Sequence, residues 1–328
     1  MTKMISLILL AASLKVQAQS VIKIDGSSTV FPITEAVSEE FQKIDKTRVT
    51  VGISGTGGGF KKFCRGETDI QNASRPISES EMETCKAAGI KFIELPIAYD
   101  ALVVAVNPKN TWAQEITLEE LKKMWEPAAD KTITQWSQIN AKWPKENIKL
   151  YGAGTDSGTF DYFTEAINGK SKASRSDFTA SEDDNTLVTG IAGDKFALGY
   201  LPLSYYEENK VRMKALAIIG GEKSPKKNKG VIPSSKTVID GSYFPLSRPI
   251  FIYVSEASMK KPEVKAYAEF YLANAPKLVP EVKYVALPAK AYAIGKENLK
   301  KNKLGTLFGG HSSIGMKIED LMKREGKM

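Results

Sequence analysis

The sequence predicts an α/β protein built of two lobes. Its 328 residues are more than one compact core readily holds, so a division into two lobes is the natural expectation. The composition is that of an ordinary globular protein, with 42% hydrophobic and 26% charged residues. Three segments far apart in the chain share one local pattern, a strand, then a turn rich in glycine and hydroxyl side chains, then a helix. This repeated pattern predicts both the α/β class and the region where function resides.

The first 18 residues read as a secretory signal peptide. Lys3 gives a positive start, residues 4–14 are apolar apart from two serines, and Val16 and Ala18 place small residues where a signal peptidase cuts. The alternative is a buried N-terminal strand or helix, which is disfavoured because a clear strand start follows at once. We expect cleavage after about Ala18 and a periplasmic mature protein. No cysteine stands directly after the expected cleavage point, so a lipid anchor on the mature N-terminus is not indicated.

The two cysteines, Cys64 and Cys85, suit an oxidising compartment, where they are expected to form one disulfide. Two buried free thiols are the alternative. A zinc site is disfavoured, because two thiols without a nearby histidine do not complete a tetrahedral shell.

The formal net charge is +8, and removal of the signal peptide with Lys3 and Lys15 leaves 8 − 2 = +6. The basic residues are scattered among acidic ones, and the one dense run, residues 226–229, reads as a solvated loop. We therefore expect no nucleic-acid partner.

Each of the three repeated units places a strand directly before a helix. The turns between strand and helix span residues 25–29, 54–59 and 152–159. A helix N-terminus has unpaired N–H groups and a partial positive charge, glycine allows close approach, and serine and threonine add donors. One such turn is usually an ordinary helix cap. Three in one chain favour a shared small anion.

Four motifs carry a more specific resemblance. DGSSTVFP at 25–32, SGTGGGF at 54–60, DIQNASRP at 69–76 and GTDSGTF at 154–160 resemble, in the same order, the ligand loops of PstS-type phosphate-binding proteins, which serve phosphate-specific ABC transporters. Residues 99–107 and 244–249 resemble the two segments by which the chain leaves and re-enters the first lobe.

The resemblance implies a periplasmic-binding-protein fold of the second type, with mixed central sheets and a ligand cleft between the lobes. After the signal peptide at 1–18, residues 19–106 and 247–328 form lobe 1, and residues 107–246 form lobe 2. The resemblance also implies a monomer that delivers inorganic phosphate to a membrane permease without any cofactor or metal.

Two positions depart from the family pattern. Where familiar members carry an aspartate that accepts the phosphate proton, this chain has Arg75, and an arginine expected near Ala153 is missing. We interpret this as one charge pair exchanged across the cleft, with Arg75 as the cation and Asp156 as the acceptor. Asp156 either faces the cleft or caps the helix that begins near Ser157, and Arg75 either meets the ligand or forms a surface ion pair. The predicted ligand-binding residues are Ser28, Thr29, Ser54, Thr56, Ser74, Arg75, Asp156, Ser157, Gly158 and Thr159.

The remaining chemical side chains favour binding over catalysis. The single histidine, His311, lies in a glycine-rich stretch without a partner for a triad. We expect the four tryptophans and the apolar face of the helix after Thr117 to lie in the core. Residues 182–184 are expected to form a solvated helix start. The alternatives to phosphate capture are another tetrahedral oxyanion, such as sulfate or molybdate, and an exported phosphatase.

Overall fold

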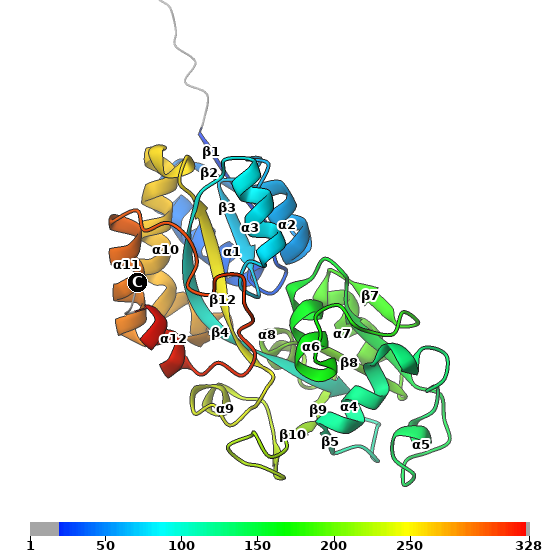
Figure 1. Ribbon diagram of the computed structural model, residues 1–328. Helices are drawn as coiled ribbons and strands as arrows, with labels where there is room; N and C mark the ends of the chain where they lie inside the picture. Colours follow the sequence, from blue (N-terminus) through cyan, green and yellow to red (C-terminus); the bar gives the residue numbers. More distant parts are fainter. Residues whose placement is uncertain (1–19, 326–328) are drawn as a thin grey trace, which may run out of the picture.

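A computed structural model describes residues 20–325 (Figure 1). The predicted signal peptide, residues 1–18, lies outside these described residues. Two α/β halves lie side by side and share one long strand (Figure 1). We call lobe 1 the half that contains both ends of the described chain, and lobe 2 the half formed by the middle of the chain. Within residues 20–325, no helix combines the length and apolar character needed to cross a membrane.

Lobe 1 is built on a mixed sheet in the order β2-β1-β3-β12-β4, with β13 pairing against β4. β1 runs parallel to β2 and β3, whereas β12 is antiparallel to β3 and β4. Helices cover both faces, with α10 and α11 on one side and α2 and α3 on the other (Figure 1). The strands are β1 (Val21–Gly26), β2 (Arg48–Val51), β3 (Ile70–Ala73), β4 (Phe92–Val106), β12 (Ser247–Ser255) and β13 (Val285–Ala286). The helices are α1 (Phe31–Ile44), α2 (Gly55–Phe63), α3 (Glu79–Ala87), η2 (Ser258–Lys260), α10 (Pro262–Glu281), α11 (Ala289–Lys300) and α12 (Ile318–Glu325).

Lobe 2 continues the sheet from the second half of β4 in the order β4-β8-β6-β7, with β9 also on β4 and a separate three-stranded sheet β11-β10-β5. Its strands are β5 (Glu115–Thr117), β6 (Lys149–Ala153), β7 (Thr179–Ser181), β8 (Ala197–Pro202), β9 (Lys214–Ala215), β10 (Ala217–Ile219) and β11 (Gly230–Val231). Its helices are α4 (Leu118–Trp125), η1 (Pro127–Ala129), α5 (Trp136–Ile139), α6 (Gly158–Asn168), α7 (Asp184–Gly193) and α8 (Leu203–Asn209). A further helix, α9 (Ser235–Ile239), lies on the stretch that returns to lobe 1 and contacts β13 and β4 (Figure 1).

The chain passes between the lobes along β4 and β12. β4 pairs with β12 through Ala101 and with β8 from Leu102 onward, so one strand belongs to both sheets. All its residues are buried, as expected for a strand covered on both faces. The predicted boundary 246/247 lies at the start of β12, whereas the predicted boundary 106/107 lies at the end of β4, beyond the point between Ala101 and Leu102 where β4 passes from one sheet to the other.

Aromatic side chains fill the core of lobe 2. Trp125 lies at the end of α4 and packs edge-on against Phe163 and Tyr200, whose rings stack 3.8 Å apart. Thr117 caps α4 by accepting a hydrogen bond from the backbone of Glu120. The predicted tryptophan core and helix cap are therefore confirmed. Large rings in such edge-on and stacked pairs each contribute more than their buried area alone.

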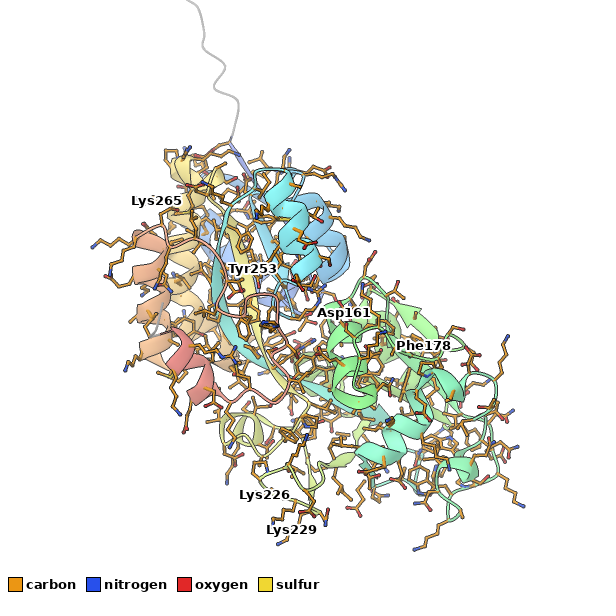
Figure 2. The ribbon with its side chains drawn as sticks, in the orientation of Figure 1. Asp161, Phe178, Lys226, Lys229, Tyr253 and Lys265 are labelled. Atoms are coloured by element: carbon orange, nitrogen blue, oxygen red, sulfur yellow. A yellow bond between two sulfur atoms is a disulfide. The ribbon has the colours of Figure 1, made fainter. Side chains whose placement is uncertain are left out.

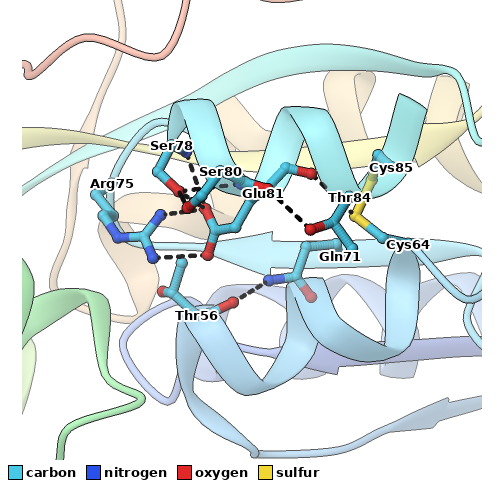
Figure 3. The surroundings of a disulfide bond; sticks show 9 residues. All are labelled: Thr56, Cys64, Gln71, Arg75, Ser78, Ser80, Glu81, Thr84 and Cys85. Atoms are coloured by element: carbon cyan, nitrogen blue, oxygen red, sulfur yellow. Dashed lines mark hydrogen bonds and ion pairs between the residues drawn. A yellow bond between two sulfur atoms is a disulfide. The ribbon is translucent and has the colours of Figure 1, made fainter. Parts of the chain in front are cut away.

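The cysteines are bonded as expected, and the disulfide ties two helices of lobe 1 together. Cys64 lies directly after α2 and Cys85 within α3 (Figure 3). The bond closes a loop with a sequence separation of 21 residues. In the chain-entropy model a loop of that size stabilises the fold by about 3 kcal/mol. The bond thereby fixes α3 against α2, whose N-terminus belongs to the candidate site.

Candidate anion-binding site

The first predicted turn, between β1 and α1, presents two hydroxyls that do not cap its helix. α1 begins after Val30 and has no side-chain cap, so neither Ser28 nor Thr29 is used for that purpose. Both residues are nonetheless buried, with 4% and 0% of their surface exposed. Tyr284 donates a hydrogen bond to the Thr29 carbonyl at 2.5 Å, and Ser27 N donates to the Asn72 carbonyl. The turn is therefore held rigidly with its hydroxyls directed inward.

The second turn leads into α2, where Thr56 is fully buried. Thr56 Oγ1 accepts a hydrogen bond from Ser74 N at 3.1 Å and lies 3.2 Å from Ser74 Oγ, which joins the end of β3 to this turn. Ser54 has a different role, because its hydroxyl donates to the carboxylate of Asp25. Lys62 also donates to that carboxylate, at 2.6 Å. Ser54 thus braces the turn through Asp25, while Thr56 and Ser74 present a pair of hydroxyls.

The third turn, at the start of α6 in lobe 2, meets the other two. Ser157 caps the helix by accepting from Thr159 N at 3.1 Å. Thr159 Oγ1 lies 3.1 Å from Thr29 Oγ1 in lobe 1. A β-carbon at Gly158 would lie 2.6 Å from both Thr56 Oγ1 and Ser74 Oγ, so only glycine permits this approach. The three predicted turns therefore converge, and each contributes a hydroxyl that is not used as a cap, from Thr29, Thr56 and Thr159.

A buried guanidinium lies among these hydroxyls. Arg248, from β12, is completely buried and donates through Nη2 to Thr159 Oγ1 at 2.8 Å and to Thr29 Oγ1 at 3.3 Å. Each of these hydroxyls accepts from Arg248. Because the two also share a hydrogen bond, one of them donates to the other, and the second keeps its hydrogen for another acceptor. The arginine thereby orients donors from both lobes toward one point.

The charge of Arg248 is balanced by Asp100 of β4, which is also fully buried. Asp100 Oδ2 accepts from Arg248 Nη2 at 3.0 Å and from Nε at 3.2 Å. Burial raises the pKa of Asp100, and the positive charge of Arg248 opposes that rise. Because the pair is neutral as a whole, attraction for an anion comes mainly from hydroxyls and helix N-terminal N–H groups.

A second carboxyl group, that of Asp184, approaches the first turn from α7. Asp184 is 2% exposed and is hydrogen-bonded by the side chain of Ser28. Among the described residues its Oδ2 atom is buried without a hydrogen-bond partner. Burial raises its pKa to about 7, Asp100 and Asp183 add to the rise, and Ser28 and Arg248 oppose it. A carboxyl with this pKa can either accept or donate a hydrogen bond near neutral pH.

These features are those of a binding site for a small oxyanion, and the comparisons with known proteins agree. A model of the PBP superfamily domain matches residues 13–275. The chain belongs to the PBP superfamily. The predicted two-lobe fold of the second type is confirmed by this match and by the mixed sheets described above.

Relatives within the PBP superfamily match nearly the whole chain. Protein SphX of Synechococcus elongatus is 52% identical over 94% of this chain and 90% of its own length. The phosphate-binding protein PstS of Staphylococcus saprophyticus is 37% identical, over 85% of this chain and 87% of its own length. A crystal structure of a possible phosphate binding protein from Planctomyces limnophilus has a TM-score of 0.64 and 47% identity, and the match covers 87% of this chain and 99% of that one. The predicted membership among PstS-type proteins is confirmed by these relatives.

The two residues expected to carry the exchanged charge pair lie beside the site of this PBP-superfamily protein. The guanidinium of Arg75 donates to Glu81 at 2.7 and 2.8 Å and to Asp161 at 2.7 Å (Figure 3 shows the Glu81 contacts). The carboxylate of Asp156 accepts from Lys61 at 2.9 Å and is 43% exposed at the rim of the lobe interface. Neither residue therefore faces the converging hydroxyls. Asp156 provides no carboxyl acceptor there, and Arg75 provides no positive charge there.

Three residues of the site were not predicted from the sequence: Asp100, Asp184 and Arg248. A signal existed for two of them. Asp100 and Glu94 are the two charged residues in the otherwise apolar β4, and Arg248 lies beside the apolar residues of β12. A charge inside a buried strand requires a partner, so an acid in one such strand and an arginine in another indicate an ion pair between them. Asp184 carried no such signal, because acids are common at helix starts.

Proposed function

We propose that this protein captures inorganic phosphate between its two lobes in the periplasm and delivers it to the permease of an ABC transporter. The observation that carries the proposal is the convergence of buried hydroxyls from both lobes on Arg248. Thr29 of lobe 1 and Thr159 of lobe 2 meet there, so an anion bound between them stabilises the closed arrangement of the lobes. The names of the PstS relatives support phosphate as that anion.

The proposed ligand set differs in part from the one expected from the motifs. We propose that the anion meets the hydroxyls of Ser28, Thr29, Thr56, Ser74 and Thr159 and the backbone N–H groups at the start of α6. Arg248 orients the hydroxyls, and Asp184 serves as the acceptor of the phosphate proton in place of Asp156. Binding proceeds without a cofactor, and the protein acts as a monomeric binding protein and not as an enzyme.

Calorimetric titration of the mature protein, freed of bound anion, tests this function. At pH 8 we expect one phosphate per protein and no response to sulfate. Sulfate bound as tightly as phosphate would move the function to another oxyanion. A protein that binds neither anion would contradict the proposed function altogether.

Asp184 makes the choice between phosphate and sulfate depend on pH. Above a pKa of about 7 its carboxylate accepts the proton of monohydrogen phosphate and repels sulfate, which has none to give. Below that pKa the protonated group donates to either anion. We therefore expect the preference for phosphate over sulfate to rise by about tenfold or more between pH 5.5 and pH 8.5, since one unpaired like charge costs at least about 1.4 kcal/mol.

The substitution Asp184→Asn should flatten this pH dependence, because the amide donates at every pH. Asp183→Asn is the matched control: Asp183 is the exposed N-cap of α7 and its side chain accepts from Asn185 N. If the preference of Asp184→Asn for phosphate over sulfate still rises with pH as in the wild-type protein, Asp184 is not the acceptor of the phosphate proton.

A further inference from the structure

The ionic cluster around Arg75 joins the two lobes. Arg75 follows β3 in lobe 1, and Asp161 lies in the first turn of α6 in lobe 2. Arg75 Nε donates to Asp161 Oδ2 at 2.7 Å, and the two side chains are only 13% and 3% exposed. Figure 2 shows Asp161 at the edge of lobe 2 that faces lobe 1. This is a well-buried ion pair that crosses the lobe boundary.

Lobe 1 holds the arginine in position for this contact. Glu81 binds it bidentately and, as part of the capping box of α3, also accepts from Ser78 N at 2.9 Å (Figure 3). The disulfide between Cys64 and Cys85 fixes α3 against α2. Arg75 Nη1 donates in addition to the carbonyl of Pro76 at 3.0 Å. The guanidinium is therefore pre-organised by its own lobe and needs only Asp161 from the other.

The cluster is built to bind its own carboxylates and not an anion. Arg75 and Lys172, whose Nζ lies 4.0 Å from Asp161 Oδ1, carry two positive charges, and Glu81 and Asp161 carry two negative charges when ionised, so the cluster has no excess positive charge. The polar contacts of the Arg75 guanidinium are with two carboxylates and a carbonyl, and none is with a hydroxyl of the site. Arg248 also binds a carboxylate and a carbonyl, but it donates in addition to two threonine hydroxyls. Burial raises the pKa of Asp161, and the charge of Arg75 counteracts that rise. Asp161 is thus costly to bury without Arg75 beside it.

The cluster and the anion site share structural elements. Ser74, at the site, directly precedes Arg75, and Gly158 and Thr159 lie less than one helical turn before Asp161 on α6. Closure that brings Gly158 to Thr56 and Ser74 therefore also brings Asp161 to Arg75. Opening would return Asp161 to water while Arg75 keeps Glu81.

We infer that Arg75 and Asp161 form a latch that stabilises the closed arrangement of the lobes and so strengthens anion binding without touching the anion, with Glu81 as the positioning residue. The inference rests on the proposed function, because the latch acts on the same closure. Arg75, which departs from the family pattern, thereby has a role in closure of the lobes. The sequence had suggested that Arg75 contacts the ligand.

A double-mutant cycle with Arg75→Met and Asp161→Asn tests the latch. Each single substitution should weaken phosphate binding by about tenfold, and the double substitution by no more than either alone, because both remove one interaction. Stopped-flow measurements should show faster dissociation of phosphate in each single variant and an unchanged association rate, since the latch forms after phosphate has bound. Small-angle X-ray scattering of the phosphate-bound state should show a more open average shape in each variant.

Two control substitutions accompany the cycle. Lys61→Met removes an ion pair that also crosses the lobes but is exposed at 64% and 43%, so it should change affinity by less than about threefold. Arg65→Met removes an exposed pair within lobe 1 and should have no effect on phosphate affinity. Additive effects of Arg75→Met and Asp161→Asn, or a loss confined to Arg75→Met, would show a direct contact with the anion and overturn the latch. Failure of the proposed function is distinguishable, because the wild-type protein would then not bind phosphate at all.

Discussion

Arg248→Met is expected to reduce phosphate affinity by about a thousandfold, since truncating one member of a buried, hydrogen-bonded charge pair costs about 2–5 kcal/mol. The substitution removes the donor that orients Thr29 and Thr159, and it leaves Asp100 buried without its cation. An uncompensated buried charge destabilises a fold by about 3–5 kcal/mol. Calorimetric titration gives the affinity, and urea unfolding gives the free energy of unfolding.

Two further variants separate the loss of binding from the loss of stability. The double substitution Asp100→Asn and Arg248→Met also removes the buried carboxylate charge that Arg248→Met leaves unpaired. Stability should therefore largely return while phosphate affinity stays low. Arg175→Met is the matched control: Arg175 is a buried arginine of lobe 2 that pairs with Asp177 and donates to the carbonyls of Met124 and Ile133, away from the site. It should lose stability and keep phosphate binding. Recovery of tight binding in the double variant would exclude Arg248 from the site.

Gly158→Ala is expected to leave both lobes folded and to lower phosphate affinity by roughly a hundredfold. Its β-carbon would meet Thr56 Oγ1 and Ser74 Oγ at 2.6 Å, both in the opposite lobe, so the clash exists only when the lobes close. Overpacking of this kind costs about 1–3 kcal/mol. Alanine favours a helix more than glycine does, so the stability of lobe 2 should not fall. Phosphate titration and thermal unfolding without phosphate measure the two effects.

The control for this substitution is Gly193→Ala at the last position of α7, where a β-carbon meets nothing within 4 Å. It should change neither closure nor phosphate affinity. Unchanged affinity in Gly158→Ala as well would mean that the lobes bind phosphate without the close approach seen between α6 and α2.

Local patterns predicted the architecture and the three turns, because each turn is encoded by contiguous residues. One glycine- and hydroxyl-rich turn is usually only a helix cap, but three in one chain favour a shared ligand, and all three meet in the structure. Arg248 and Asp184 were not predicted as site residues, because their roles depend on which strands and helices become neighbours. Arg248 reaches the turns only because β12 inserts between β3 and β4.

The charge pair at the lobe boundary illustrates the same limit. The sequence suggested an exchange of charges across the cleft between Arg75 and an acidic residue of the third turn. The residue that meets Arg75 is Asp161, five residues beyond Asp156. Asp156 precedes the N-cap Ser157 and lies outside the helix, whereas Asp161 lies inside α6, and only the packing of α6 against lobe 1 decides which of the two faces the arginine.

The position of β12 in the sheet also determines the order in which the protein is assembled. Lobe 2 is one continuous stretch of chain, so it can fold as soon as that stretch has been synthesised. Lobe 1 cannot, because β12 lies between β3 and β4 and is among the last strands to emerge. Until then β3 and β4 each expose an unpaired edge, the kind of surface on which chains aggregate. The return strand that carries Arg248 therefore joins β3 to β4 and brings the arginine to the binding site in a single step.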